Sequence, residues 1–431
     1  MTTTSRLRRA GLVGLLAAAL ALIGCTPAVA GNVRISHKLF GVHDASLLAT
    51  SHIHQGAVRL WDAGVQWQSV ETSRHHYNWT RLDQLVSAAR SHHQEVTMVV
   101  AGTPPFYAPH RDPTKPPRKM SHYADFLRHL MKRYGRRISA YEVWNESNIR
   151  TFWSGTNLQM ARLSRIAYKV RNRLQPHAKL VAPAMVTGRD WELDIMRDFF
   201  ATRIDGKPVW RYYNAIALSL YPFARANGST GTPEDSMRRL AKARRVLRAD
   251  HVPGSKPVWN TEINYGNQTG DLQGRHAYKI SAARQSSFVV RTYLLNAAAG
   301  LRRVFWYRYD MNNLPADIGG GTLSNTLLSK PGDPSQVTRA GKTYALVQQW
   351  MHGTLLGSRH KRPCAQDRHG TYVCVVKDST GVRRIYWNPS GKATVRVSKY
   401  AHHVQGVFGG ITSIKPGSLL TVTAQPVMVY H

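Results

Sequence analysis

The 431-residue chain has little cysteine and comparatively few acidic residues. Its 3 cysteines do not combine with histidine at the spacing of a zinc site, so no metal is expected. No Gly-rich dinucleotide fingerprint follows the first predicted strand, and no cofactor is expected. Against 24 aspartates and glutamates stand 59 lysines and arginines, which gives a formal net charge of +35.

This positive charge favours a polyanionic partner, such as a charged envelope polymer, a membrane surface or nucleic acid. Adaptation to an anionic cell wall, without direct recognition, explains the charge equally well, because basic residues occur in nearly every segment. The chain has no recognised nucleic-acid-binding motif, and an exported protein does not meet cytoplasmic nucleic acid. We therefore expect no nucleic-acid partner.

The apolar run near the N-terminus, residues 10–24, is too short to span a bilayer comfortably. It follows a basic segment, so residues 1–24 are predicted to be an export signal. The stretch Leu22-Ile23-Gly24-Cys25 resembles the lipobox of bacterial lipoproteins, in which the cysteine carries a diacylglycerol. Lipidation of Cys25 is favoured, and cleavage after Ala30 is the alternative. The protein is expected to be anchored at the outer side of the cell membrane, or to be secreted if Cys25 is not lipidated.

Cys364 and Cys374 remain once Cys25 is assigned to the lipid. They flank a turn-like stretch, residues 366–370, and an oxidising compartment permits disulfides. The two cysteines are therefore predicted to close a short hairpin loop.

Residues 37–354 alternate short apolar, β-rich runs with longer amphipathic helical patterns. Eight strands are predicted, the number that a closed parallel barrel needs, so the expected fold class is α/β, a (β/α)8 TIM barrel. A doubly wound open sheet shows the same alternation, but the strand count and the positions of the carboxylates favour the barrel. The predicted strands are residues 39–43, 57–61, 96–102, 140–145, 180–185, 216–221, 258–263 and 304–309.

Residues 355–431 have a different pattern, in which short alternating segments are separated by turn residues. This pattern predicts a small C-terminal β-sandwich packed on the barrel. No low-complexity linker divides the two parts, so one rigid unit is expected. Residues 25–36 are predicted to be an N-terminal tether.

Two predicted strands deliver a glutamate near their C-terminal ends, where barrel active sites are built. Glu146 ends the fourth strand and Glu262 lies in the seventh, 116 residues later. Strands four and seven face one another across a barrel mouth, so the two carboxyl groups are expected to oppose each other. Glycosidic cleavage needs such a pair, because one group protonates the leaving oxygen while the other attacks the anomeric carbon. Their surroundings should hold one pKa high and keep the other group ionised.

With Asn145 directly before Glu146 and the second glutamate on strand seven, the sequence resembles clan A of the glycoside hydrolases. The stretch 141–148 resembles family 39 in particular, and the resemblance covers the whole barrel. It implies a retaining enzyme with Glu146 as acid/base and Glu262 as nucleophile. It also implies that Asn145 donates to the sugar 2-hydroxyl.

The same resemblance implies four further roles. Arg59 matches the arginine beneath the nucleophile; an ion pair with Glu142 is its alternative role. Tyr221 matches a tyrosine that hydrogen-bonds the nucleophile, and a plain core tyrosine is the alternative. Trp306 matches the sugar platform of strand eight, with its neighbour Tyr307 as the fallback. His43 matches a residue that contacts the glycone, and a structural histidine is its alternative.

The chain departs from the clan at Ser147, Thr103 and Ser219, where members often have proline or histidine. These departures leave the two glutamates untouched but put the glycone pocket implied by the resemblance in doubt, so the sugar is not transferred by resemblance. The expected partner is a poly- or oligosaccharide, with envelope furanosides such as galactofuran or arabinan, or an exopolysaccharide, as leading candidates. Basic and aromatic residues at 104–119 suit an anionic glycan, and residues 319–321 suit a lid. The alternative function is a non-catalytic glycan-binding envelope lipoprotein, which would be free to lose one of the two glutamates.

Overall fold

The computed structural model describes residues 31–46, 53–222, 231–265, 280–310, 327–330, 333–358 and 361–431. The predicted export signal, Cys25 and the predicted lid at 319–321 lie outside these residues. Within the described ranges, no helix is both long and apolar enough to cross a membrane.

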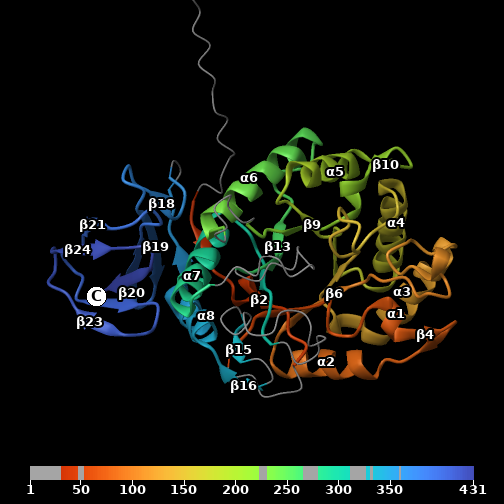
Figure 1. The fold of residues 1–431 in the computed structure, drawn as a ribbon, viewed down its shortest axis with the longest axis horizontal. Coiled ribbons are helices and arrows are strands. Elements are labelled where there is room, and N and C mark those ends of the chain that lie inside the picture. Colours follow the sequence, from red (N-terminus) through yellow and green to blue (C-terminus); the bar gives the residue numbers. More distant parts are fainter. Residues whose placement is uncertain are drawn as a thin grey trace, which may run out of the picture.

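The central sheet is the predicted barrel (Figure 1). The fifth predicted strand has two parts, because Pro183 interrupts it and has no N–H to donate to a ladder. The first part pairs with strand four and the second with strand six, and Val181 bridges to Ala215 to close the sheet. All eight predicted positions hold a strand, which confirms the fold class. In spatial order the strands are β2 (Phe40–Val42), β3 (Ala57–Leu60), β6 (Glu95–Val99), β7 (Ala140–Glu142), β8 (Lys179–Val181) with β9 (Met185–Val186), β12 (Ile216–Ser219), β13 (Val258–Ile263) and β14 (Val304–Trp306).

Helices surround this sheet (Figure 1). Several begin at a side chain that caps free N–H groups, as at Thr232, whose Oγ accepts from Asp235 N while Asp235 accepts from Thr232 N. The helices are α1 (Trp67–Val70), α2 (Thr80–Ser91), α3 (Met120–Tyr134), α4 (Asn157–Leu174), α5 (Asp190–Ala201), α6 (Pro233–Ala249), α7 (Ala282–Ala298) and α8 (Arg339–Trp350). Shorter elements connect them: η1 (His37–Leu39), β4 (Glu71–Ser73), β5 (His76–Tyr77), η2 (Pro109–Arg111), η3 (Gly135–Arg137), β10 (Arg203–Ile204), β11 (Lys207–Pro208), η4 (Val209–Tyr212), β15 (Ser329–Lys330) and β16 (Asp333–Val337).

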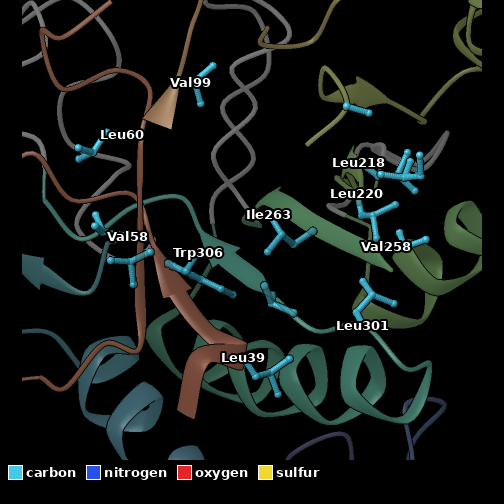
Figure 2. Close-up of a cluster of buried hydrophobic side chains, with 14 of the residues drawn as sticks. Leu39, Val58, Leu60, Val99, Leu218, Leu220, Val258, Ile263, Leu301 and Trp306 are labelled. Atoms are coloured by element: carbon cyan, nitrogen blue, oxygen red, sulfur yellow. The ribbon is translucent and has the colours of Figure 1, made fainter. Parts of the chain in front are cut away.

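The two faces of the barrel strands carry different residues. One face packs against the helices and is apolar, with Val58, Leu218, Ile263 and Trp306 among its members (Figure 2). The other face lines the barrel interior, where alanines from several strands surround the rings of Trp259 and Phe305. Because side chains alternate along a strand, the next inward position toward the C-terminal end carries the polar groups of the mouth.

The C-terminal domain is an antiparallel sheet, at the left of Figure 1, with a second small sheet over one face. Ile385 and Trp387 pack into the barrel core, whereas Tyr386 and Val429 face the smaller sheet. The predicted disulfide between Cys364 and Cys374 is present. The large sheet contains β17 (Thr354–Leu355), β18 (Ala365–Gln366), β19 (Tyr372–Asp378), β20 (Gly381–Trp387), β22 (His403–Gly406), β23 (Ile411–Ser413) and β25 (Val427–Tyr430), and the small one β21 (Ala393–Arg396) and β24 (Leu419–Val422).

Polar contacts also join the two domains. Trp387 Nε1 donates to Glu234 of α6 over 3.0 Å, and Arg291 of α7 forms a buried ion pair with the same carboxylate. Residues 33–34, expected in the tether, instead form β1 (Val33–Arg34), which pairs with β17 at the edge of the large sheet. The N-terminal segment therefore belongs to the C-terminal sheet from Val33 onward.

Candidate active site

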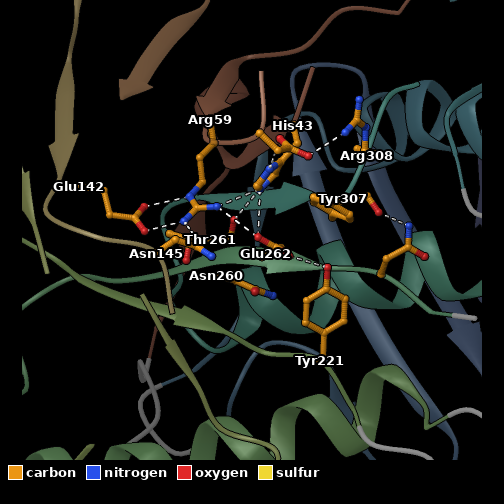
Figure 3. A network of polar contacts seen from close by, with 12 residues as sticks. His43, Arg59, Glu142, Asn145, Tyr221, Asn260, Thr261, Glu262, Tyr307 and Arg308 are labelled. Carbon is orange, nitrogen blue, oxygen red and sulfur yellow. Dashed lines mark hydrogen bonds and ion pairs between the residues drawn. The ribbon is translucent and has the colours of Figure 1, made fainter. Parts of the chain in front are cut away.

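Glu262 lies on a β-bulge in β13. Asn260 pairs with Val304 and Ile263 with Trp306, so β13 has one more residue than β14 over this stretch. Such a bulge re-aims a side chain and is common beside active sites. Here the Glu262 carboxylate points into the mouth of the barrel (Figure 3).

Three predicted residues converge on this carboxylate. Tyr221 donates its O–H to Glu262 Oε1 over 3.0 Å, and Arg59 Nη1 donates to Oε2 over 3.2 Å. His43 Nε2 lies 3.9 Å from Oε2. Donors to the charged form of a carboxylate favour its ionisation, so these contacts orient Glu262 and favour its anionic form.

Arg59 connects this anion to the fourth strand (Figure 3). Its Nε and Nη2 donate to the two oxygens of Glu142 over 2.9 and 2.6 Å, and Nη2 also donates to Asn145 Oδ1 over 2.9 Å. Both roles considered for Arg59 are therefore present at once. Because the Asn145 oxygen is occupied, its amide nitrogen, which has no acceptor among the described residues, is left as a donor.

Glu146 has a different environment. It follows β7 with a backbone φ of 37°, in the left-handed region that non-glycine residues seldom adopt. Burial raises the pKa of Glu146 to about 7, and the charges of Glu192 and Glu142 add to this effect. Ser219 and Arg59 act in the opposite direction.

Burial and the charge of Glu146 also raise the pKa of Glu262 to about 7, against the effects of His43 and Arg59. The two carboxylates therefore lie close enough for the charge of one to affect the titration of the other. Because Glu262 accepts from both Arg59 and Tyr221, these contacts favour its charged form over that of Glu146. A retaining glycoside hydrolase requires such a difference, because one carboxyl group must donate a proton while the other attacks as an anion.

His43 has a hydrogen-bond partner at one ring nitrogen and a carboxylate near the other. Nε2 lies 2.9 Å from Thr261 O, so it carries the hydrogen and donates to that carbonyl, and Nδ1 lies 3.6 Å from Asp62 Oδ1. Asp62 also accepts from Arg308 Nη1 over 2.7 Å. Burial raises the pKa of Asp62, but His43 and Arg308 outweigh it and hold that pKa well below its usual range.

No family model matches the chain. Two curated β-xylosidases are similar to part of it. The β-xylosidase from Caldicellulosiruptor saccharolyticus is 27% identical over 190 residues, which cover 42% of this chain and 36% of that protein. The β-xylosidase from Geobacillus stearothermophilus is 25% identical over 189 residues, which cover 38% of this chain and 35% of that protein. The matched region thus spans about a third of these relatives.

Solved structures match over nearly the whole chain. A glucosidase from Croceicoccus marinus has a TM-score of 0.64 at 14% identity, covering 93% of this chain and 96% of that one. A family 39 glycoside hydrolase from Bacteroides cellulosilyticus WH2 has a TM-score of 0.62 at 16% identity, covering 92% and 82%. The fold is that of the clan A glycoside hydrolases.

Within this clan A fold, Trp306 does not lie where the resemblance placed it. Its side chain is fully buried on the helix-facing side of β14, where its ring centroid lies 6.0 Å from that of Tyr265. A ring in that layer offers no face to a sugar. The inward position belongs to Tyr307, whose ring centroid lies 5.0 Å from that of His43.

Sequence reasoning did not select Asp62 or Arg308. Nevertheless, a signal was present, because Asp310, Asp44 and Asp62 directly follow strands eight, one and two, which are neighbours in a barrel. In a chain with 24 acids, three at adjacent strand ends are a marker of the mouth. Among the described residues, no cluster of His, Cys, Asp and Glu suits a metal ion.

Proposed function

We propose that the protein is a retaining glycoside hydrolase that cleaves O-glycosidic bonds, with Glu146 as acid/base and Glu262 as nucleophile. The observation that carries the proposal is the different surroundings of the two carboxylates. Glu262 accepts from Arg59 and Tyr221, whereas Glu146 is buried beside further negative charge. The β-xylosidase names of the curated relatives support the same reaction class.

The reaction proceeds in two displacements. In the first, a Glu262 oxygen bonds to the anomeric carbon while the glycosidic bond breaks, and the leaving oxygen takes the Glu146 proton. In the second, Glu146 accepts a proton from water, whose oxygen displaces Glu262 at the anomeric carbon. The amide nitrogen of Asn145 donates to the 2-hydroxyl of the sugar in both steps. Arg59 holds the Asn145 side chain in place by donating to its Oδ1.

The decisive experiment uses Glu262→Ala with an activated aryl glycoside. We expect hydrolysis to be abolished, and azide or formate to restore part of it with a product of inverted anomeric configuration, which NMR identifies. Glu95→Ala is the matched control, because this carboxylate forms an ion pair with Arg303 at the N-terminal end of the barrel strands. Undiminished hydrolysis by Glu262→Ala would refute the nucleophile assignment.

We further propose that the substrate is a cell-envelope or extracellular polysaccharide, such as galactofuran, arabinan or an exopolysaccharide. The predicted export signal and the charge of +35 support a polymer outside the cell. Incubation with a panel of such polymers, with xylan included because of the β-xylosidase relatives, and mass analysis of the products give both the sugar and the endo or exo mode. Release of products from xylan alone would contradict the envelope substrate.

For localisation, we propose export and lipid anchoring through Cys25. Metabolic labelling with palmitate should modify the wild type and not Cys25→Ser, and the variant should leave the membrane fraction. A mature N-terminus at Gly31 in the wild type would instead indicate cleavage after Ala30 and secretion.

A further inference from the structure

A pocket lies at the end of the barrel opposite the two carboxylates. It has a volume of about 410 Å³ and lies among η4, α4 and the start of β13. Residues 203–215 lead into β12 and Lys256 precedes β13, so both lie at the N-terminal ends of strands, whereas Glu146 and Glu262 lie at C-terminal ends. We call it the basal pocket; its lining is Tyr168, Lys207, Trp210, Arg211, Tyr212 and Lys256.

The charges of the basal pocket are all of one sign. Lys207 and Arg211 are exposed, and within the described residues neither forms an ion pair. The nearby acid Asp205 is paired with Arg165 over 2.5 Å and does not line the pocket. Three cations around one concavity repel one another, and an anion between them would relieve that repulsion.

Lys256 makes the argument stronger because its ammonium group is half-buried. Nζ donates to Tyr213 O over 2.5 Å and lies 5.6 Å from the centre of the Trp210 ring, but no described carboxylate lies within ion-pair distance. Burial lowers the pKa of Lys256. A desolvated cation that is not paired within the protein is unfavourable, so a bound anion would compensate for this loss of hydration.

The remaining surface is aromatic. Trp210, Tyr168 and Tyr212 supply ring surface, and the volume falls within the range of about 300–1,000 Å³ typical of pockets for organic ligands rather than single ions. Rings next to cations suit a sugar that carries a carboxylate, because its C–H face packs on a ring while its acid meets the charges.

We propose that the basal pocket is a second saccharide site that binds a uronate unit of an anionic polysaccharide. The choice of a saccharide rests on the proposed glycosidase function. The site holds the polymer on the enzyme while another part of it occupies the catalytic mouth. It takes no part in bond cleavage.

Calorimetry with Glu262→Gln protein, which should not turn the ligand over, tests binding alone. We expect digalacturonate to bind, a neutral disaccharide to bind at least about tenfold more weakly, and the affinity to fall as ionic strength rises from about 0.01 M to about 1 M. Lys207→Ala/Arg211→Ala, added to this protein, should weaken digalacturonate binding about tenfold or more, whereas Lys392→Ala/Lys415→Ala should not. The latter pair removes two exposed cations from the C-terminal domain.

Equal losses in the two double variants would overturn the site in favour of diffuse attraction. If inorganic phosphate binds as tightly as digalacturonate, the assignment of the pocket to a saccharide is wrong. In the otherwise wild-type enzyme, Lys207→Ala/Arg211→Ala should leave kcat on a small aryl glycoside unchanged and raise KM for an anionic polymer. Hydrolysis without digalacturonate binding refutes this proposal alone, whereas binding without hydrolysis refutes the proposed function alone.

Discussion

The hydrogen bond from Tyr221 to Glu262 gives a direct test of how the nucleophile is held. Tyr221→Phe removes one oxygen and keeps the ring, so the packing of this half-buried residue is unchanged. Burial and the charge of Glu262 raise the pKa of Tyr221 well above its usual value. The phenol therefore remains a neutral donor at any working pH, and the variant removes only the donation over 3.0 Å.

A hydrogen bond to a charged group contributes about 1.5–3 kcal/mol, and about 1.4 kcal/mol corresponds to a factor of ten. If the ionised fraction and the orientation of the Glu262 carboxylate limit the rate of the first displacement, Tyr221→Phe lowers kcat/KM about 10- to 100-fold. Loss of the donor raises the pKa of Glu262. Because Glu262 acts as the anion, the acidic limb of the pH profile moves to higher pH, and the loss is larger at acid pH than at neutral pH.

The assay measures kcat/KM for an activated aryl glycoside across the pH range. Tyr107→Phe is the matched control, because Tyr107 donates to the carboxylate of Glu71 over 2.9 Å, away from the catalytic pair. A Tyr221→Phe enzyme within twofold of the wild type, with an unmoved acidic limb, would refute the reasoning. So would an equal loss in Tyr107→Phe, since the effect would then be one of folding.

Three further predictions follow from the same contacts. The activity of the wild type should fall as the pH rises through about 7, because Glu146 loses its proton. Glu146→Gln should remove this basic limb of the pH profile. The same variant should slow the hydrolysis of substrates with poor leaving groups far more than that of activated aryl glycosides. Arg59→Met leaves the Glu142 carboxylate buried without its partner, so urea unfolding should show a loss of about 3–5 kcal/mol, and a loss below about 1 kcal/mol would contradict the ion-pair argument. Tyr307→Ala should raise KM for aryl glycosides, whereas Trp306→Phe should lower thermal stability and leave KM unchanged, and the reverse pattern would restore Trp306 as the platform.

The positions of the barrel strands follow from sequence because each strand of a closed parallel sheet is buried on both faces and reads as a short apolar run. Differences arise where a local feature competes with that pattern. Pro183 splits the fifth strand into β8 and β9, although the apolar run continues through it. The pair Val33 and Arg34 is too short to show any period, so its place beside β17 depends on a partner more than 300 residues away.

The two glutamates and Arg59 could be predicted because their types and strand positions carry the chemistry. The orientation of neighbouring aromatics could not. Which of Trp306 and Tyr307 faces the mouth depends on the register of β14 against β2 and on the bulge in β13, both non-local. A shift of one residue in the register of a strand moves each side chain to the opposite face of the sheet. A run of consecutive aromatic residues therefore does not by itself show which of them faces the mouth.

Among the described residues, acids gather at the mouth although the whole protein is positively charged, and this difference predicts the kind of sugar that is cleaved. Buried acids follow or end strands one, four, seven and eight, the half-buried Asp62 follows strand two, and among the described residues Arg59 and Arg308 form ion pairs with acids of this group. Burial and the charge of Asp44 raise the pKa of Asp310 to about 6, as expected for crowded acids.

A carboxylate on the sugar between Glu146 and Glu262 would add one more negative charge to this cluster, and like charges within a few ångströms repel strongly in a buried site. We therefore expect a neutral glycone, with any negative charge of the polymer carried at a distance, over the basic surface. Aryl glycosides that differ only at C6, as a hydroxymethyl or as a carboxylate, test this directly. The neutral compound should be cleaved at least about tenfold faster, and preference for the uronide would place the anion in the mouth and remove the electrostatic argument.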